Sequence, residues 1–119
     1  MRKVAIVGGS GYIGAELAGL LVNHPGIAIA DMASHTHAGS MVADIHPALG
    51  AFTDLRYCKS IPENSEAELV FVATEYGSSM EQVHGLLARG MKVIDMSGDY
   101  RFTDAELYKI WYGIQHKDP

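Results

Sequence analysis

The sequence contains little cysteine, tryptophan or proline, and no hydrophobic run long enough to cross a membrane. Its 119 residues include one cysteine, one tryptophan and four prolines. The single cysteine, Cys58, excludes an internal disulfide bond. The apolar run before the first glycines, Val4 to Val7, is too short for a signal peptide or a membrane span. We therefore expect no membrane partner, and the cytoplasm is the expected compartment.

Positive charge is also sparse. The nine lysines and arginines are outnumbered by fourteen acidic residues, which leaves a net charge of −5. The basic residues are scattered and form no stripe that would follow a phosphate backbone, so nucleic acid is not an expected partner. With 48% hydrophobic residues the chain can bury one core, but it is too short for two ordinary domains. Residues 1–119 are therefore expected to form one domain.

Short apolar runs alternate with segments of helical period, as in a parallel sheet whose strands are joined by crossover helices. Strands are expected over residues 3–7, 27–33, 68–73 and 91–95, the last two buried on both faces. The first helix is expected to bury a stripe of four apolar residues, Ile13, Leu17, Leu20 and Leu21. The predicted fold class is α/β, with a Rossmann-type, doubly wound, mainly parallel sheet.

Two capping-box patterns mark the starts of later helices. Ser79 with Gln82, and Thr103 with Glu106, begin helices that should run to about residues 90 and 111. The least regular stretch is 34–64, where residues 55–58 suit a short strand and residues 46–50 suit the end of a helical turn.

Four glycines fall within Gly8 to Gly14, directly after the first expected strand. Glycine inside a regular element costs roughly 0.5–1 kcal/mol relative to alanine, so this much bare backbone needs a reason. Gly9-Ser10-Gly11-Tyr12-Ile13-Gly14 fits G-x-G-x-x-G, and the overlapping spacing of Gly8, Gly11 and Gly14 fits it too. Between a strand and a helix, such glycines let the backbone approach a dinucleotide pyrophosphate. The alternative is a glycine-rich turn with no ligand, and Ser10 suits a helix cap, a phosphate contact or both.

Other polar residues have simpler interpretations. His35, His37 and His46 lack the spacing of a zinc site, so we interpret them as loop histidines and expect no metal. Cys58 follows a tyrosine in an apolar stretch and is more typical of a small buried hydrophobe than of a nucleophile. Asp99 and Arg101 come after the fourth expected strand. They either form a local ion pair or contribute to a site, because strand C-terminal ends bind ligands in such sheets.

The end of the second strand distinguishes the two nicotinamide dinucleotides. NAD sites place an acid there for the ribose 2′-hydroxyl, whereas NADP sites need neutral or basic donors for the 2′-phosphate. Asp31 lies 17 residues after Gly14 and suits the acid. However, the shared parity of Ala28, Ala30, Met32 and Ser34, and an apolar run that continues to Ala33, place Asp31 inside the strand. The tip is then Ser34, His35 and Thr36, so we predict NADP, bound more tightly as the pH falls and His35 becomes protonated.

Five motifs occur in an order and spacing typical of one family: GGSGYIGAEL at 8–17, HP with a later glycine at 46–50, VFVAT at 70–74, VIDMSGDYRF at 93–102 and WYGIQH at 111–116. Together they resemble the N-terminal part of N-acetyl-gamma-glutamyl-phosphate reductase, over essentially the whole chain. The glycine motif also suits aspartate-semialdehyde dehydrogenases, whereas the last two motifs are more specific. The chain departs from the family at Glu75-Tyr76-Gly77, where the family usually has a histidine before the glycine, so no contact is carried over there.

The resemblance implies NADPH-dependent reduction of N-acetylglutamyl 5-phosphate to the 5-semialdehyde with release of phosphate, a step of arginine biosynthesis, by a homo-oligomer. Family members use a cysteine in a Pro-Gly-Cys-Tyr-Pro context and a later histidine. Neither occurs in this chain, so we expect no catalytic residue here and no activity from the chain alone. The candidate cofactor-binding residues are Gly9, Ser10, Gly11, Tyr12, Ile13, Gly14, Ser34, His35, Thr36 and Thr74.

Two other functions remain open. A related reductase acting on aminoadipyl or aspartyl phosphate would share these motifs. A non-enzymatic dinucleotide-binding module would need only the glycine loop and the sheet. A Pro-Gly-Cys sequence in the reading frame after residue 119 would favour a reductase over the binding module.

Overall fold

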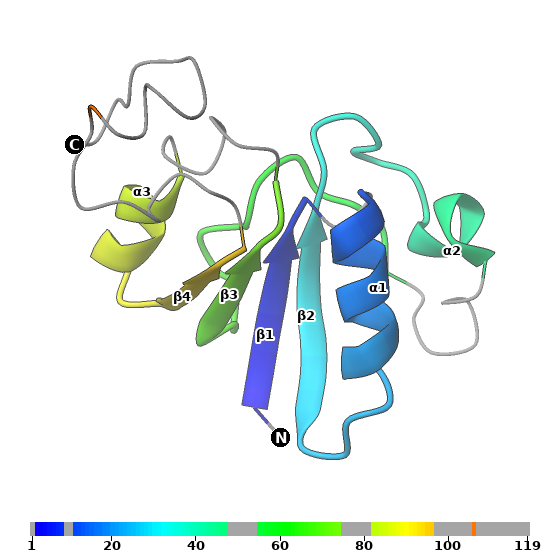
Figure 1. Ribbon diagram of the computed structural model, residues 1–119, viewed down its shortest axis with the longest axis horizontal. Helices are drawn as coiled ribbons and strands as arrows, with labels where there is room; N and C mark the ends of the chain where they lie inside the picture. Colours follow the sequence, from blue (N-terminus) through cyan, green and yellow to red (C-terminus); the bar gives the residue numbers. More distant parts are fainter. Residues whose placement is uncertain (1, 9–10, 48–54, 75–81, 97–105, 107–119) are drawn as a thin grey trace.

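The computed structural model describes residues 2–8, 11–47, 55–74, 82–96 and 106 (Figure 1). Four parallel strands form one sheet in the order β2-β1-β3-β4. They are β1 (Arg2–Val7), β2 (Ile27–Ala33), β3 (Leu69–Val72) and β4 (Lys92–Asp95). The helices are α1 (Tyr12–Leu21), α2 (Val42–Ile45) and α3 (Val83–Ala88). The predicted doubly wound parallel sheet is confirmed, with each strand within one residue of its expected bounds.

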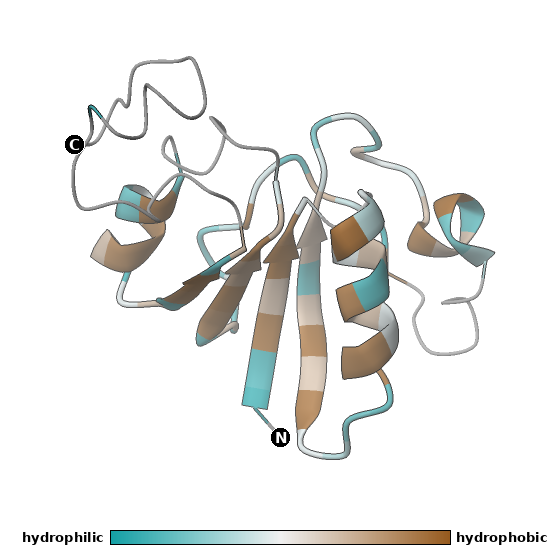
Figure 2. Ribbon diagram, in the orientation of Figure 1, coloured by the Kyte–Doolittle hydropathy of each residue, from teal (hydrophilic) through white to brown (hydrophobic). Residues whose placement is uncertain are grey.

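Both faces of the sheet are covered, and β1 shows why. Val4 and Ile6 point into a cluster that also contains buried residues of α1 and α2, whereas Ala5 and Val7 point into a second cluster with α3. All four side chains are at most 4% exposed. A strand with a core on each side has no polar face, which is why it appears in the sequence as a continuous apolar run. Figure 2 shows this pattern, with β1 hydrophilic at its start and hydrophobic beyond it.

The first helix buries only part of the expected stripe: Leu21 is buried and Leu17 packs against the core, as expected. Its buried residues are Gly14, Ala18 and Leu21, whereas Ile13 is 50% exposed and Leu20 is 73% exposed. The expectation that Ile13 and Leu20 face the core was therefore wrong. Small side chains such as those at positions 14 and 18 allow a helix to lie close to a sheet. Positions 14, 18 and 21 have the spacing of one helix face, just as the expected stripe does.

The fourth strand is less covered than expected. Among the described residues β4 pairs only with β3, and Ile94 is 46% exposed. The expectation of a strand buried on both faces was therefore wrong for β4 in this part of the chain. Val93 packs against the cluster that contains α3, whereas Ile94 belongs to neither core cluster. An apolar run has the same appearance whether one face of its strand is covered or both, and the packing of other elements on the sheet decides which applies.

The irregular stretch forms bridges in place of a full strand. Met41 pairs with Arg56 in an antiparallel bridge, and Ala33 pairs with Cys58 in a parallel one. A helical turn was expected to end within residues 46–50, and α2 ends just before that range, at Ile45, with His46 as its C-cap. Residues 48–50 lie outside the described part. The third helix was expected to begin after a cap at residue 79. In the structure α3 begins at Val83, and residue 82 is its N-cap. Residues 79, 103 and 107–111 lie outside the described part, and residue 106 is helical.

Candidate functional site

Gly8 forms the turn that leaves β1. Its φ angle is +83°, and a Cβ built there would lie 2.8 Å from the carbonyl oxygen of Ala73 and 3.1 Å from the Thr74 nitrogen. The Gly8 N–H donates to the Ala33 oxygen at 2.9 Å, which ties the turn to the end of β2. Only glycine combines this backbone angle with such a close approach to the end of β3.

The glycine motif follows the spacing of residues 8, 11 and 14. Gly11 is the N-cap of α1, and its N–H donates to the Gly8 oxygen at 3.1 Å. A Cβ on Gly11 would meet only that oxygen, at 3.4 Å, so its outer side is open. Gly14 is buried where α1 meets the sheet. These are the three glycine roles of a dinucleotide fingerprint: a tight turn, open backbone for the pyrophosphate, and close helix packing. Residues 9 and 10 lie outside the described part.

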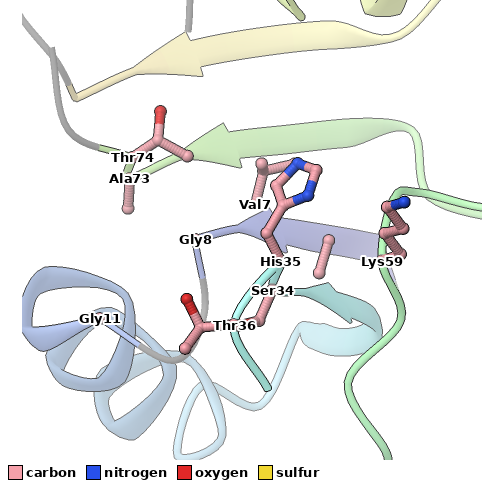
Figure 3. Close-up of a pocket in the computed structure, with 10 residues that line it drawn as sticks. Val7, Gly8, Gly11, Ser34, His35, Thr36, Lys59, Ala73 and Thr74 are labelled. Carbon is pink, nitrogen blue, oxygen red and sulfur yellow. The ribbon is translucent and has the colours of Figure 1, made fainter. Parts of the chain in front are cut away.

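A pocket of about 310 Å³ lies at the C-terminal ends of β1, β2 and β3. This is the switch point of the sheet, because the chain places β2 on one side of β1 and β3 on the other. Ligands of doubly wound folds bind at this point. Figure 3 shows one wall at the end of β2 and another at the end of β3. The lining residues are Val7, Gly8, Gly11, Ala33, Ser34, His35, Thr36, Lys59, Ala73 and Thr74.

Half of the predicted cofactor-binding residues meet in this pocket: Gly11, Ser34, His35, Thr36 and Thr74. Tyr12 and Ile13 are not among the lining residues, and both side chains are largely exposed on α1. Five lining residues were not predicted from the sequence: Val7, Gly8, Ala33, Lys59 and Ala73. Gly8 had a signal in the overlapping glycine spacing, whereas nothing local marked Lys59. The candidates Asp99 and Arg101 lie outside the described residues.

Asp31 is turned away from the pocket. It lies inside β2, as predicted, and its carboxylate accepts a hydrogen bond from the Ser65 hydroxyl at 2.5 Å. The parity argument was wrong in detail, because the β1–β2 register skips Ala30, and Ala30 and Met32 pack on opposite faces. The extra residue of this bulge shifts the alternation of the strand.

The loop after β2 is held by Ser34. Its hydroxyl accepts a hydrogen bond from the His37 N–H at 3.1 Å, and the residue is 4% exposed. This serine turn leaves His35 and Thr36 exposed beside the pocket. The wall at the end of β2 therefore combines hydroxyl, imidazole and ammonium groups, and no carboxylate belongs to the pocket lining in the described part of the chain.

A family model described as the NAD binding domain of semialdehyde dehydrogenase matches residues 3–116. The chain belongs to this family. In an NAD-binding domain, the dinucleotide is expected at the switch point of the sheet. The pocket and the glycine turn of this chain lie at that point.

Individual relatives agree with the sequence resemblance. The N-acetyl-gamma-glutamyl-phosphate reductase of Methanococcus maripaludis is 43% identical over 119 residues, which cover 98% of this chain and 35% of the relative. A Nitrosopumilus maritimus protein, named as a phosphate reductase for LysW-linked L-2-aminoadipate and L-glutamate, is 41% identical over 98% of this chain and 34% of the relative. The domain therefore spans about a third of the length of the curated relatives it matches.

One solved structure shows the same fold. Aspartate semialdehyde dehydrogenase from Candida albicans, solved with NADP, matches with a TM-score of 0.78 at 21% identity, covering 88% of this chain and 32% of that one.

The resemblance to the N-terminal part of N-acetyl-gamma-glutamyl-phosphate reductase, predicted from the motifs, is confirmed at the level of sequence.

The wall at the end of β3 holds a polar atom in need of a partner. The Thr74 Oγ1 is buried and has no hydrogen-bond partner among the described residues. A buried hydroxyl without a partner costs on the order of 1–3 kcal/mol. Together with the open backbone at Gly11, this atom fits a site built for a polar ligand.

Cys58 lies below the surface, as predicted. Its thiol donates to the Met32 oxygen at 3.3 Å. Burial raises the pKa of the thiol above its ordinary value, and the nearby Asp31 carboxylate raises it further. A raised pKa disfavours the thiolate, which is the nucleophilic form.

Cys58 should therefore react slowly with thiol reagents. At pH 8 we expect its labelling by iodoacetamide to be at least several-fold slower than that of free cysteine, because both burial and the raised pKa reduce the exposed thiolate. Rates measured by mass spectrometry between pH 7 and 10 check this. Labelling as fast as free cysteine across this range would contradict it.

Two further functions find no support among the described residues. No group of three or more histidine, cysteine, aspartate or glutamate residues in this part of the chain is arranged to hold a metal ion. None of the helices described is long and apolar enough to span a membrane.

Proposed function

We propose that this domain binds NADP through the switch-point pocket, and that it does so as the cofactor-binding part of an acyl-phosphate reductase. The observation that carries the proposal is the pairing of two walls in one pocket. One wall, at the start of α1, offers the open backbone of Gly11. The other, the donor wall at the end of β2, offers hydroxyl, imidazole and ammonium groups, and no carboxylate is found among the described residues that line the pocket. A pyrophosphate needs the first kind of wall and a 2′-phosphate needs the second.

Each wall has a separate task in this proposal. The backbone N–H groups at the start of α1 would face the pyrophosphate, where the helix dipole also favours negative charge. His35 and Thr36 would lie beside the adenosine ribose, and Thr74 would bond the part of the cofactor that crosses the end of β3. The bound nicotinamide would supply the hydride, and the nucleophile and proton carrier of the family motifs are absent from this sequence.

We propose N-acetylglutamyl 5-phosphate as the substrate of the whole enzyme, reduced to the semialdehyde in the cytoplasm by a homo-oligomer. The names and identities of the relatives support this choice. A second candidate, a carrier-linked aminoadipyl or glutamyl phosphate, is favoured by the nearly equal identity of the Nitrosopumilus maritimus relative. Phosphate-dependent oxidation of N-acetylglutamate 5-semialdehyde by the full-length enzyme would support the first, and oxidation of the carrier-linked semialdehyde alone would support the second.

The cofactor proposal is tested by binding. We expect calorimetric titration to show NADPH binding at least about tenfold more tightly than NADH, because the donor wall gains bonds only from the 2′-phosphate. Equal affinities, or tighter binding of NADH, would contradict the proposal. Failure of both to bind would leave only the fold in common with the family.

Asp31→Ser is expected to leave the ratio of NADPH to NADH affinity unchanged. The Asp31 carboxylate is bonded to Ser65 and is not part of the pocket lining, so it offers nothing to a ribose. Loss of its hydrogen bond should lower the free energy of unfolding by about 1 kcal/mol. Titration of the variant with both cofactors provides the measurement. A clear gain in relative NADPH affinity would show that Asp31 contacts the ribose after all.

A further inference from the structure

Lys59 reaches the pocket from a segment distant in sequence from both the glycine turn and the loop after β2. The Cys58 N–H donates to the Met32 oxygen at 3.0 Å, and the Ser34 N–H donates to the Cys58 oxygen at 2.8 Å. Cys58 thus continues the sheet for one bridge beyond β2, opposite Ala33. The next residue, Lys59, is consequently held beside the loop that carries His35 and Thr36 (Figure 3).

The segment that carries Lys59 is anchored firmly. Tyr57, two residues earlier, is 2% exposed and packs in the cluster under α1. The backbone N–H of Tyr57 donates to the Ser40 carbonyl oxygen at 2.9 Å, and the Tyr57 carbonyl oxygen accepts from the Gly39 N–H at 2.8 Å. The backbone before Lys59 is therefore fixed by bonds to both β2 and the loop that follows β2, while the lysine itself is exposed.

Lys59 is the one residue with a fixed positive charge among the described residues that line the pocket. Among the described residues Lys59 forms no ion pair, and none of those that line the pocket is acidic. Most other described cations have protein acceptors elsewhere: Arg2 with Glu68, Lys3 with Glu66, Arg56 with the Gly39 oxygen, and Arg89 with the Ile61 and Pro62 oxygens. Lys59 is thus a cation placed at a donor wall with its charge available.

We propose that Lys59 binds the 2′-phosphate of NADP and is a specificity-determining residue for NADP over NAD. The inference rests on the proposed function of this pocket and adds the cation that the loop after β2 lacks. The side of the pocket supports this assignment. Lys59 lies by the end of β2, where the adenosine ribose of a doubly wound fold lies, and Gly11 lies on the pyrophosphate side. Ser34, His35 and Thr36 contribute bonds around the same phosphate, and Lys59 contributes its countercharge.

The test compares ligands that differ by the 2′-phosphate. Lys59→Met, Lys59→Arg and a control, Lys92→Met, are titrated with adenosine 2′,5′-bisphosphate, 5′-AMP, NADPH and NADH. Lys92 is an exposed lysine at the start of β4 and is not part of this pocket. We expect Lys59→Met to weaken adenosine 2′,5′-bisphosphate and NADPH about tenfold and to leave 5′-AMP and NADH unchanged. Lys59→Arg and Lys92→Met should both bind like the parent protein.

The dependence of binding on ionic strength provides a second readout, which does not require catalytic activity. In the parent protein NADPH affinity should fall more steeply with ionic strength than NADH affinity, and Lys59→Met should remove most of that difference. If the parent protein prefers NADPH but Lys59→Met weakens all four ligands equally, or none, the assignment of Lys59 is overturned while the cofactor proposal stands. If the parent protein shows no preference, the cofactor proposal itself fails.

Discussion

A Gly11→Val variant should bind NADPH at least about 100-fold more weakly than the parent protein and unfold at nearly the same urea concentration. The valine side chain would fill the open side of Gly11, where the proposed pyrophosphate meets the start of α1. Losing two charge-assisted hydrogen bonds of about 1.5–3 kcal/mol each accounts for the expected loss. Folding should tolerate the change, because φ at Gly11 is −75° and an added Cβ has a single contact, at 3.4 Å from the Gly8 oxygen.

Calorimetric titration and urea denaturation of the same preparation check both parts of this prediction. Gly19→Val serves as a control, since Gly19 also lies in α1 and an added Cβ there meets nothing within 4 Å. The control should keep its NADPH affinity. Unchanged NADPH binding by Gly11→Val would show that the cofactor does not use the start of α1.

Gly8→Ala should lower stability far more than a methyl addition at Gly11, the other glycine that lines the pocket. Backbone with φ of +83° costs a non-glycine residue roughly 1–2 kcal/mol. The added Cβ would also lie 2.8 Å from the Ala73 oxygen, so the ends of β1 and β3 must separate. We expect a total loss of about 3 kcal/mol or more in the free energy of unfolding.

A matched glycine separates the two causes. Gly90, after α3, has a φ angle of +82°, but an added Cβ there meets nothing within 4 Å. Gly90→Ala should therefore show only the backbone cost of roughly 1–2 kcal/mol. Urea denaturation of both variants gives the difference directly. Equal losses at Gly8 and Gly90 would mean that the contact with the end of β3 contributes nothing to stability.

Local patterns were sufficient for the positions of the strands in the sequence and for a parallel sheet. A strand covered on both faces is apolar where it is buried, so β3 and the part of β1 from Val4 onward stand out from the sequence without knowledge of their neighbours. The bounds of β2 were also predicted, although this strand contains Asp31. The position of the glycine turn follows equally directly, because a cluster of glycines between a strand and a helix has few other uses. The motifs that resemble the reductase family depend only on sequence and were confirmed by the relatives.

Positions that depend on packing between distant segments were less accessible. The face of α1 that meets the sheet was chosen by the small residues Gly14 and Ala18, and hydrophobicity alone ranks Ile13 and Leu20 above them. The exposed side of β4 depends on which elements cover the two faces of the sheet there, which the run of residues 91–95 does not encode. In both cases the residue pattern is compatible with two arrangements, and the packing of the sheet selects one.

By itself, the sequence determined the fold class, the glycine turn and the loop after β2 that forms one wall of the pocket. Tertiary structure alone decided three features of the site. A bulge at Ala30 and the bond to Ser65 take Asp31 out of it, the contact with Ala73 makes glycine necessary at position 8, and the bridge at Cys58 brings in Lys59. The physical reason is the same for all three. Each depends on a contact between residues that are distant in the sequence, such as the bridge between Ala33 and Cys58. No local propensity or spacing records such a contact.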